Sequence, residues 1–221
     1  MRDLARPKVL KWSAAAALVS AAVCYPELSL WTERAKPLWY LESLLCLGGT
    51  VLWAFVFAWF PKYANRPVFT LRAGAWVWSL ATFWGLATAI VLYRFVDPAL
   101  HAQKPLDYPA NVEQWFARTL FSLAFIQLVM VFAPFSWLLR LTGSAQVAAM
   151  FTVLFGGFVL AFQHPAAPAP VPVTLLLGML AQRLLNGAFS VYFFLRGGVV
   201  LVWWWHLLLQ SRHWWRIQSG W

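Results

Sequence analysis

The sequence predicts an all-α fold, a polytopic transmembrane helix bundle of about seven spans that forms one integral membrane domain over residues 1–221. Hydrophobic residues make up 62% of the chain and charged residues only 11%, with a mean hydropathy of +0.66. A soluble domain carries roughly 25% charged residues, so this chain has more apolar surface than a globule of its size can bury. The apolar residues also fall into stretches of about 20, the length of helix that crosses a bilayer. Lipid is therefore expected to cover the excess apolar surface.

Charged residues or prolines bound the seven apolar stretches, which run over residues 9–25, 38–60, 73–96, 111–141, 145–163, 173–195 and 199–215. The first stretch follows several basic residues, so a secretory signal peptide is an alternative for it. The fourth is overlong and contains Pro134, which predicts a kink or a separate short helix. The fifth and sixth are separated by the proline-rich segment 164–172, which cannot continue a helix.

The basic residues predict the orientation, because short cytoplasmic loops are rich in Lys and Arg. The N-terminus and the loops on its side of the bundle hold most of them, namely Arg2, Arg6, Lys8, Lys11, Lys62, Arg66, Arg72, Arg140 and Arg196. The formal net charge of +10 then faces anionic lipid. No aromatic-basic pattern suggests a nucleic-acid partner. Because the loops are short, a bacterial cytoplasmic membrane is the expected location.

Five polar side chains fall within or at the ends of the predicted spans, and these are Glu113, Arg118, His164, His206 and Gln210. An ionisable group inside a bilayer costs about 2.5–3.5 kcal/mol even on insertion scales, and such groups usually serve a function. In the predicted topology, three different spans bring these side chains to a similar depth in the outer half of the membrane. His206 and Gln210 are four residues apart, so they share one face of a helix. We therefore expect these spans to share one polar site.

Three short motifs contain these residues: Glu113-Gln114-x-x-x-Arg118, Leu160-x-x-x-His164 and His206-x-x-x-Gln210. Their order and spacing resemble the CPBP family of intramembrane endopeptidases, which includes CAAX proteases and bacteriocin-processing proteins. The motifs of that family are Glu-Glu-x-x-x-Arg, Phe-x-x-x-His and His-x-x-x-Asn or Asp. The resemblance covers residues 110–212 and implies a catalytic core there. This chain departs from the family pattern at Gln114, Leu160 and Gln210.

The resemblance implies an endopeptidase that hydrolyses a peptide bond of a membrane-inserted or lipid-adjacent protein substrate. Glu113 would act as the general base on a water molecule that His164 helps to hold. His206 would stabilise the oxyanion and protonate the leaving amine, and Gln210 would donate a second hydrogen bond. Arg118 would orient the helix turn of Glu113. Two histidines and a glutamate are also plausible zinc ligands, although activation of the water without a metal or another cofactor is favoured.

Two other functions are open alternatives. A small transporter would use Glu113 and the histidines as a proton relay, although the two halves of the chain show no internal repeat. A catalytically inactive relative would bind membrane peptides through the same cavity. Gln114 raises this alternative, because a neutral amide leaves Arg118 in need of another acid, such as Glu113 or Glu42. The hydrolase hypothesis requires that Glu113, His164 and His206 lie close enough to share one water molecule.

Overall fold

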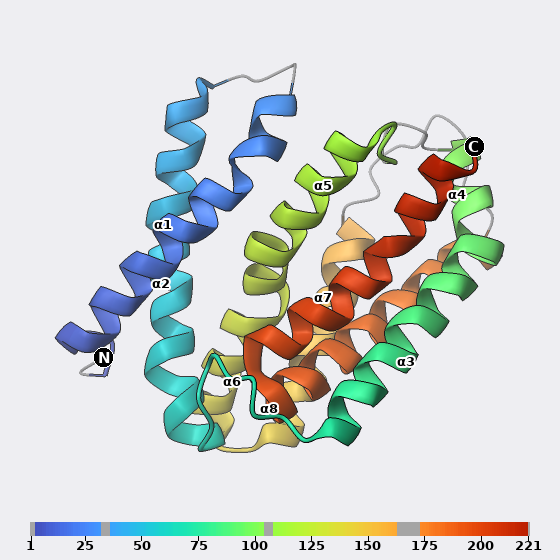
Figure 1. The fold of residues 1–221 in the computed structure, drawn as a ribbon. Coiled ribbons are helices and arrows are strands. Elements are labelled where there is room, and N and C mark those ends of the chain that lie inside the picture. Colours follow the sequence, from blue (N-terminus) through green and yellow to red (C-terminus); the bar gives the residue numbers. More distant parts are fainter. Residues whose placement is uncertain (1–2, 32–35, 104–107, 163–172, 221) are drawn as a thin grey trace.

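The computed structural model describes residues 3–31, 36–103, 108–162 and 173–220, which form a bundle of helices (Figure 1). Within these residues the helices are joined by short loops, and no β-strand is present. The predicted all-α fold class is therefore confirmed.

The helices follow one another in the order α1 (Pro7–Leu30), α2 (Leu38–Ala64), α3 (Ala75–Val91), η1 (Leu92–Val96), α4 (Asp97–Gln103), α5 (Val112–Phe121), η3 (Ser122–Ile126), η4 (Leu128–Phe132), α6 (Ala133–Thr142), α7 (Ala145–Phe162) and α8 (Val173–Gln218). The η segments are π-helical turns, and they join α3 to α4 and α5 to α6 without a break. Pro134 lies in the first turn of α6, directly after the π-helical turn η4. In Figure 1, α1 and α2 form a pair on one side, and α3 packs beside α8 on the other.

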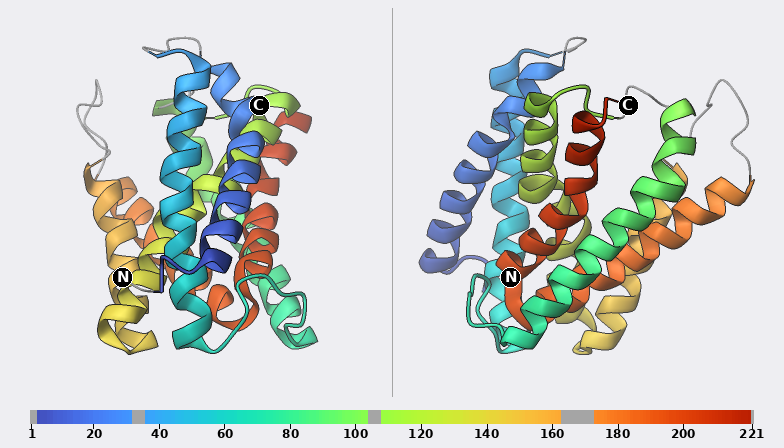
Figure 2. Two further views of the ribbon diagram at one scale, coloured as in Figure 1. Left: turned by 90° about the vertical axis from the view of Figure 1, so that its left-hand side faces the viewer. Right: turned by 45° about the vertical axis from the view of Figure 1, so that its right-hand side comes forward.

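Among the described residues, five helices are long and apolar enough to cross a membrane, as in a multi-pass membrane protein. This count is lower than the seven predicted spans. α7 contributes a shorter apolar helix over Ala145–Val159. The sixth and seventh predicted stretches lie together in α8, whose 46 residues would extend for about 69 Å if straight, more than twice the thickness of a bilayer core. The backbone instead leaves the helical conformation at Gly198, and the two arms of α8 form a V (Figure 2).

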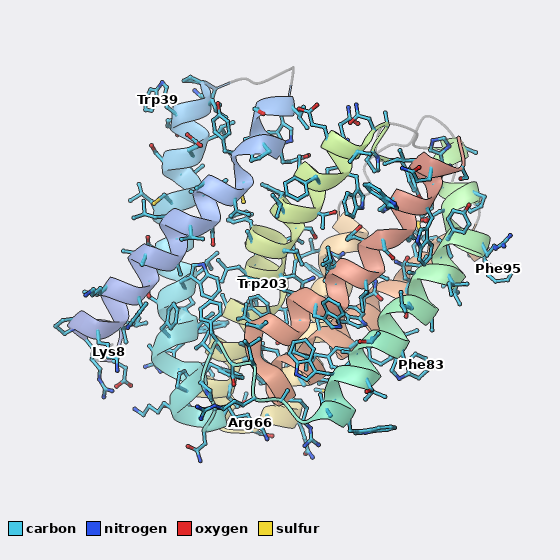
Figure 3. All side chains as sticks on the ribbon, in the orientation of Figure 1. Lys8, Trp39, Arg66, Phe83, Phe95 and Trp203 are labelled. Atoms are coloured by element: carbon cyan, nitrogen blue, oxygen red, sulfur yellow. The ribbon has the colours of Figure 1, made fainter. Side chains whose placement is uncertain are left out.

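A glycine makes the corner of α8 possible. Gly198 has φ 66° and ψ −162°, a region of backbone conformation that is essentially confined to glycine. The loop after α2 packs against this corner: the Val199 N–H donates a hydrogen bond of 3.0 Å to the Val68 carbonyl. Arg66, labelled in Figure 3, donates another of 3.0 Å to the Arg196 carbonyl. A Cβ at position 198 would collide with the Val68 carbonyl oxygen, so the loop and the glycine together fix the corner.

The core lies where α2, the η4–α6 segment and α8 meet. Phe60 stacks on Phe194 with ring centroids 4.1 Å apart, and Phe132 packs on the same ring at 4.8 Å. All three side chains are fully buried. On the outer side of the bundle, Phe83 and Phe95 are exposed and point away from the neighbouring helices (Figure 3). Apolar side chains exposed in this way fit a protein whose outer surface faces lipid.

One ion pair ties the N-terminal segment to the end of α2, and a second lies within the segment. The Asp3 carboxylate lies 2.8 Å from the Lys62 ammonium and 2.7 Å from the Arg6 guanidinium. The hydrogen bond that Lys62 donates is the main reason why the pKa of Asp3 lies below its usual value. The pairs are exposed, so they orient the segment rather than stabilise it strongly.

Candidate functional site

His206 lies at the centre of a set of polar side chains inside the bundle. It is buried in the second arm of α8. Its Nε2 is 2.9 Å from the Ser122 hydroxyl and 3.0 Å from the amide nitrogen of Gln210. Its Nδ1 is 3.1 Å from the amide nitrogen of Gln127. Because Ser122 and Gln127 belong to the segment from α5 to α6, this polar group joins two helices.

The π-helical turn η3 explains why Ser122 and Gln127 both reach the imidazole. The two residues are five positions apart, which in a regular α-helix turns their side chains about 140° away from each other. A π-helical turn pairs residues i and i+5 instead, and such turns are frequent at functional sites. Since η3 spans Ser122–Ile126 and Gln127 follows it directly, both side chains lie on the face toward α8.

The hydrogen-bond partners favour one arrangement of protons around the imidazole. A neutral imidazole has one N–H donor and one acceptor nitrogen, so amide N–H groups cannot satisfy both ring nitrogens. The Oε1 of Gln127 is buried and has no partner within the described protein. The Gln127 amide nitrogen therefore donates to Nδ1, and Nε2–H donates to the Ser122 hydroxyl or, with the Gln210 amide turned, to the Gln210 oxygen. The group therefore suits a neutral imidazole that carries its proton on Nε2.

Two tryptophans hold the helices together on either side of His206. The Trp203 indole donates a hydrogen bond of 2.8 Å to the Leu123 carbonyl, and Figure 3 shows this side chain beside the α5 segment. The Trp115 indole donates one of 2.9 Å to the Gln210 carbonyl. The Leu123 carbonyl lies in the π-helical turn η3, where the regular hydrogen-bond pattern of an α-helix is changed. These bonds fix the distance between the two helices that share the polar group.

A cavity of about 150 Å³ adjoins the imidazole. Four amide side chains line it together with hydroxyl groups and arginines, and the amides are Gln127, Gln182, Asn186 and Gln210. Three residues of its lining carry a buried polar atom that has no hydrogen-bond partner among the residues that the structure describes, and these atoms are Gln127 Oε1, Asn186 Oδ1 and the indole Nε1 of Trp205. Buried polar atoms without partners are rare and require an explanation. Over the described part of its lining, the cavity has no carboxylate.

A second cavity of about 260 Å³ lies next to the first. The two cavities share Ser122, Ile126, Gln210 and Arg212 in their linings. Charged side chains line the second cavity, among them Arg118 and Glu27, whose side chains approach to 3.8 Å. Glu27 on α1 is therefore one acid close to Arg118, and it was not among the acids that the sequence suggested. A polar route therefore runs from this charged cavity to His206.

A buried ion pair supports the same end of the bundle. The Arg212 guanidinium lies 3.1 Å from the Asp97 carboxylate, which also accepts a hydrogen bond of 3.1 Å from the Tyr108 hydroxyl. Burial and the Asp97 charge raise the pKa of Tyr108, so this hydroxyl keeps its proton and remains a donor. The Asp97 charge offsets that of Arg212 at the edge of both cavities.

The first motif of the sequence begins α5 rather than entering the cavity. The side-chain oxygen of Asn111 accepts a hydrogen bond of 2.9 Å from the backbone N–H of Gln114. The side-chain oxygen of Gln114 accepts one of 2.9 Å from the backbone N–H of Ala110. This reciprocal pattern is a capping arrangement at a helix N-terminus. Glu113 is an exposed acid in the first turn, where the helix dipole favours negative charge.

The structure therefore brings only part of the predicted site together. Glu113 lines neither cavity. It precedes Ser122 by nine residues, which places it about 13 Å away along the helix and on the opposite face. The Glu113 carboxylate therefore does not lie beside the His206 imidazole in this arrangement. His206 and Gln210 are neighbours as expected, Arg118 lines only the second cavity, and His164 lies outside the described residues.

The sequence reasoning missed several residues of the cavity wall. Ser122 and Gln127 are ordinary polar residues within an apolar span, and Asn186 lies in another span. The signal that points to them is the same one that singled out His206, because a buried amide in a span also needs a partner. Their common orientation depends on the π-helical turn, which has no sequence signature.

No group of three or more metal-ligating side chains is present among the residues that the structure describes. His206 has hydroxyl and amide neighbours, which are weak ligands for zinc. The described residues around this imidazole therefore do not fit the predicted zinc alternative.

Comparison with known proteins adds no relative, because no protein-family model, no curated protein and no solved structure matches this chain.

Proposed function

We propose that this protein binds a membrane-inserted peptide through the cavity at His206, as a peptide-binding relative of the CPBP family rather than as a hydrolase. The three buried polar atoms without partners, all in residues that line the cavity, support this proposal most directly. Gln127 Oε1 and Asn186 Oδ1 are acceptors for a peptide N–H, and Trp205 Nε1 is a donor for a peptide carbonyl. A peptide that unwinds inside a bilayer needs such partners, since each unsatisfied backbone group costs several kcal/mol there.

The arrangement favours binding over hydrolysis because the imidazole has no acid beside it. A hydrolase of the expected type needs a carboxylate that activates a water molecule within hydrogen-bond reach of the imidazole. Among the described lining residues the cavity offers amides, hydroxyls, an indole, an imidazole and arginines, without a carboxylate. These groups recognise a peptide, and none of them matches the general base of the hypothesis.

The endopeptidase stays a second candidate, which the order of the three motifs favours. The hydrogen bond of 3.0 Å between Gln210 and His206 is also what an oxyanion-stabilising pair would require. In this candidate function a carboxylate has to reach His206 when the substrate binds.

The test uses the full-length protein in liposomes and a fluorescent hydrophobic peptide. Fluorescence anisotropy measures binding, and mass spectrometry of the same samples measures cleavage. We expect saturable binding with the peptide intact. Asn186→Leu should weaken binding about 10-fold, the effect of losing one buried hydrogen bond of roughly 1.5 kcal/mol. Gln218→Leu is the matched control, because Gln218 is an exposed amide at the end of α8 and should leave the affinity unchanged.

Two results would contradict the proposal. Cleavage that is lost in both Glu113→Gln and His206→Ala would establish the endopeptidase instead. Equal affinity of the wild type and Asn186→Leu, with Gln218→Leu also unchanged, would show that the peptide binds elsewhere on the bundle.

A further inference from the structure

Arg183 is a cation inside the bundle that lacks a visible counter-ion. It lies on the first arm of α8, is half-buried and lines the same cavity as His206. Within the described residues it forms no ion pair and no hydrogen bond. The other arginine of the cavity, Arg212, is paired with Asp97. The described wall of the cavity therefore has one positive charge that no negative charge offsets. Such a charge is costly within a membrane span, and residues that carry one usually have a function.

Arg183 and His206 lie at different depths along the V of α8. Arg183 is 15 residues and His206 is eight residues from Gly198, which corresponds to about 22 Å and about 12 Å along the two arms. The backbone positions of the two residues along the arms therefore differ by about 10 Å, while both side chains line the same cavity.

We propose that Arg183 binds a carboxylate of the peptide that occupies the cavity, an inference that rests on the proposed function. A guanidinium binds a carboxylate through two parallel hydrogen bonds, and one such group matches the single uncompensated charge. The neighbouring acceptors Gln127 Oε1 and Asn186 Oδ1 need N–H donors. A peptide supplies these donors as backbone N–H groups together with its carboxylate, whereas phosphatidylglycerol has no N–H group and offers only the two hydroxyls of its glycerol headgroup.

The experiment measures the affinity of the full-length protein in phosphatidylcholine liposomes for a series of C-terminally amidated hydrophobic peptides. Each peptide has a single Glu at a different position and is matched with the same peptide carrying Gln. A further peptide carries Gln and a free C-terminus. Comparing it with the amidated Glu peptides distinguishes binding of a side-chain carboxylate from binding of the terminal carboxylate. We expect at least one carboxylate peptide to bind about 10-fold more tightly than its neutral match, the usual effect of a charge-assisted hydrogen bond.

Arg183→Gln should abolish this preference, and Arg94→Gln should retain it, because Arg94 is exposed on η1 and lines neither cavity. The wild-type comparison needs no variant, so misfolding of Arg183→Gln leaves the test intact. Equal binding of every matched pair by the wild type would overturn the carboxylate assignment while leaving peptide binding in place. Absence of binding by all peptides would instead refute the proposed function. Loss of the preference in liposomes containing phosphatidylglycerol would show that Arg183 binds lipid phosphate, which also overturns the assignment.

Discussion

Replacing Gly198 with alanine should destabilise the protein by about 2–4 kcal/mol. The residue holds a backbone conformation that costs a residue with a side chain roughly 1–3 kcal/mol. The new Cβ would also collide with the Val68 carbonyl oxygen. Moving that carbonyl breaks the hydrogen bond from the Val199 N–H, which adds about 1 kcal/mol. A single methyl group at the corner between the two arms of α8 is therefore predicted to have a large effect.

Far-UV circular dichroism of the protein in detergent micelles, followed against denaturant concentration, measures this loss. Gly48→Ala is the matched control, because Gly48 lies within α2 and an added Cβ would meet no atom within 4 Å. That substitution should stabilise the helix by roughly 0.5–1 kcal/mol. The reasoning is refuted if Gly198→Ala unfolds at the same denaturant concentration as the wild type.

Three further predictions follow from the ion pairs and hydrogen bonds. Asp97→Asn should lower the free energy of unfolding by about 3–5 kcal/mol because it leaves the buried Arg212 cation unpaired; denaturant unfolding measures this, and a loss below about 1 kcal/mol contradicts it. Lys62→Ala should raise the pKa of Asp3, measured by carboxyl NMR. Because the folded pKa of Asp3 is depressed, its contribution to stability is present at neutral pH and is lost as the pH falls through that pKa. Ser122→Ala should cost about 1 kcal/mol through the lost hydrogen bond to the imidazole, and an unchanged stability in the same assay argues against that bond.

The fold class was predictable because apolar stretches of span length leave few alternatives to a helical bundle. The number of spans was less predictable, because it depends on where one helix ends and the next begins. Gly198 lies between two predicted spans, but its positive φ is imposed by the packing of the Val68 loop on the corner. Contacts between residues so far apart in sequence cannot be inferred from the local pattern.

The candidate site was predictable only where local geometry determines it. The spacing of four residues between His206 and Gln210 places them on one helix face, and the structure shows them in hydrogen-bond contact. Glu113 was assigned to the same site because of its sequence motif. In the structure the nearby Asn111 and Gln114 form a helix cap, so this motif marks the start of α5. Gln127 was missed because its approach to the imidazole depends on a π-helical turn.

Side-chain NMR of isotope-labelled protein tests most directly whether the cavity at His206 is where a peptide binds. The resonances to follow are the imidazole nitrogens of His206 and the amide nitrogens of Gln127 and Asn186, with Gln218 as the internal reference. Addition of the hydrophobic peptide should shift the first three residues and leave Gln218 in place. Saturable peptide binding without a shift at His206, Gln127 or Asn186 would contradict the account.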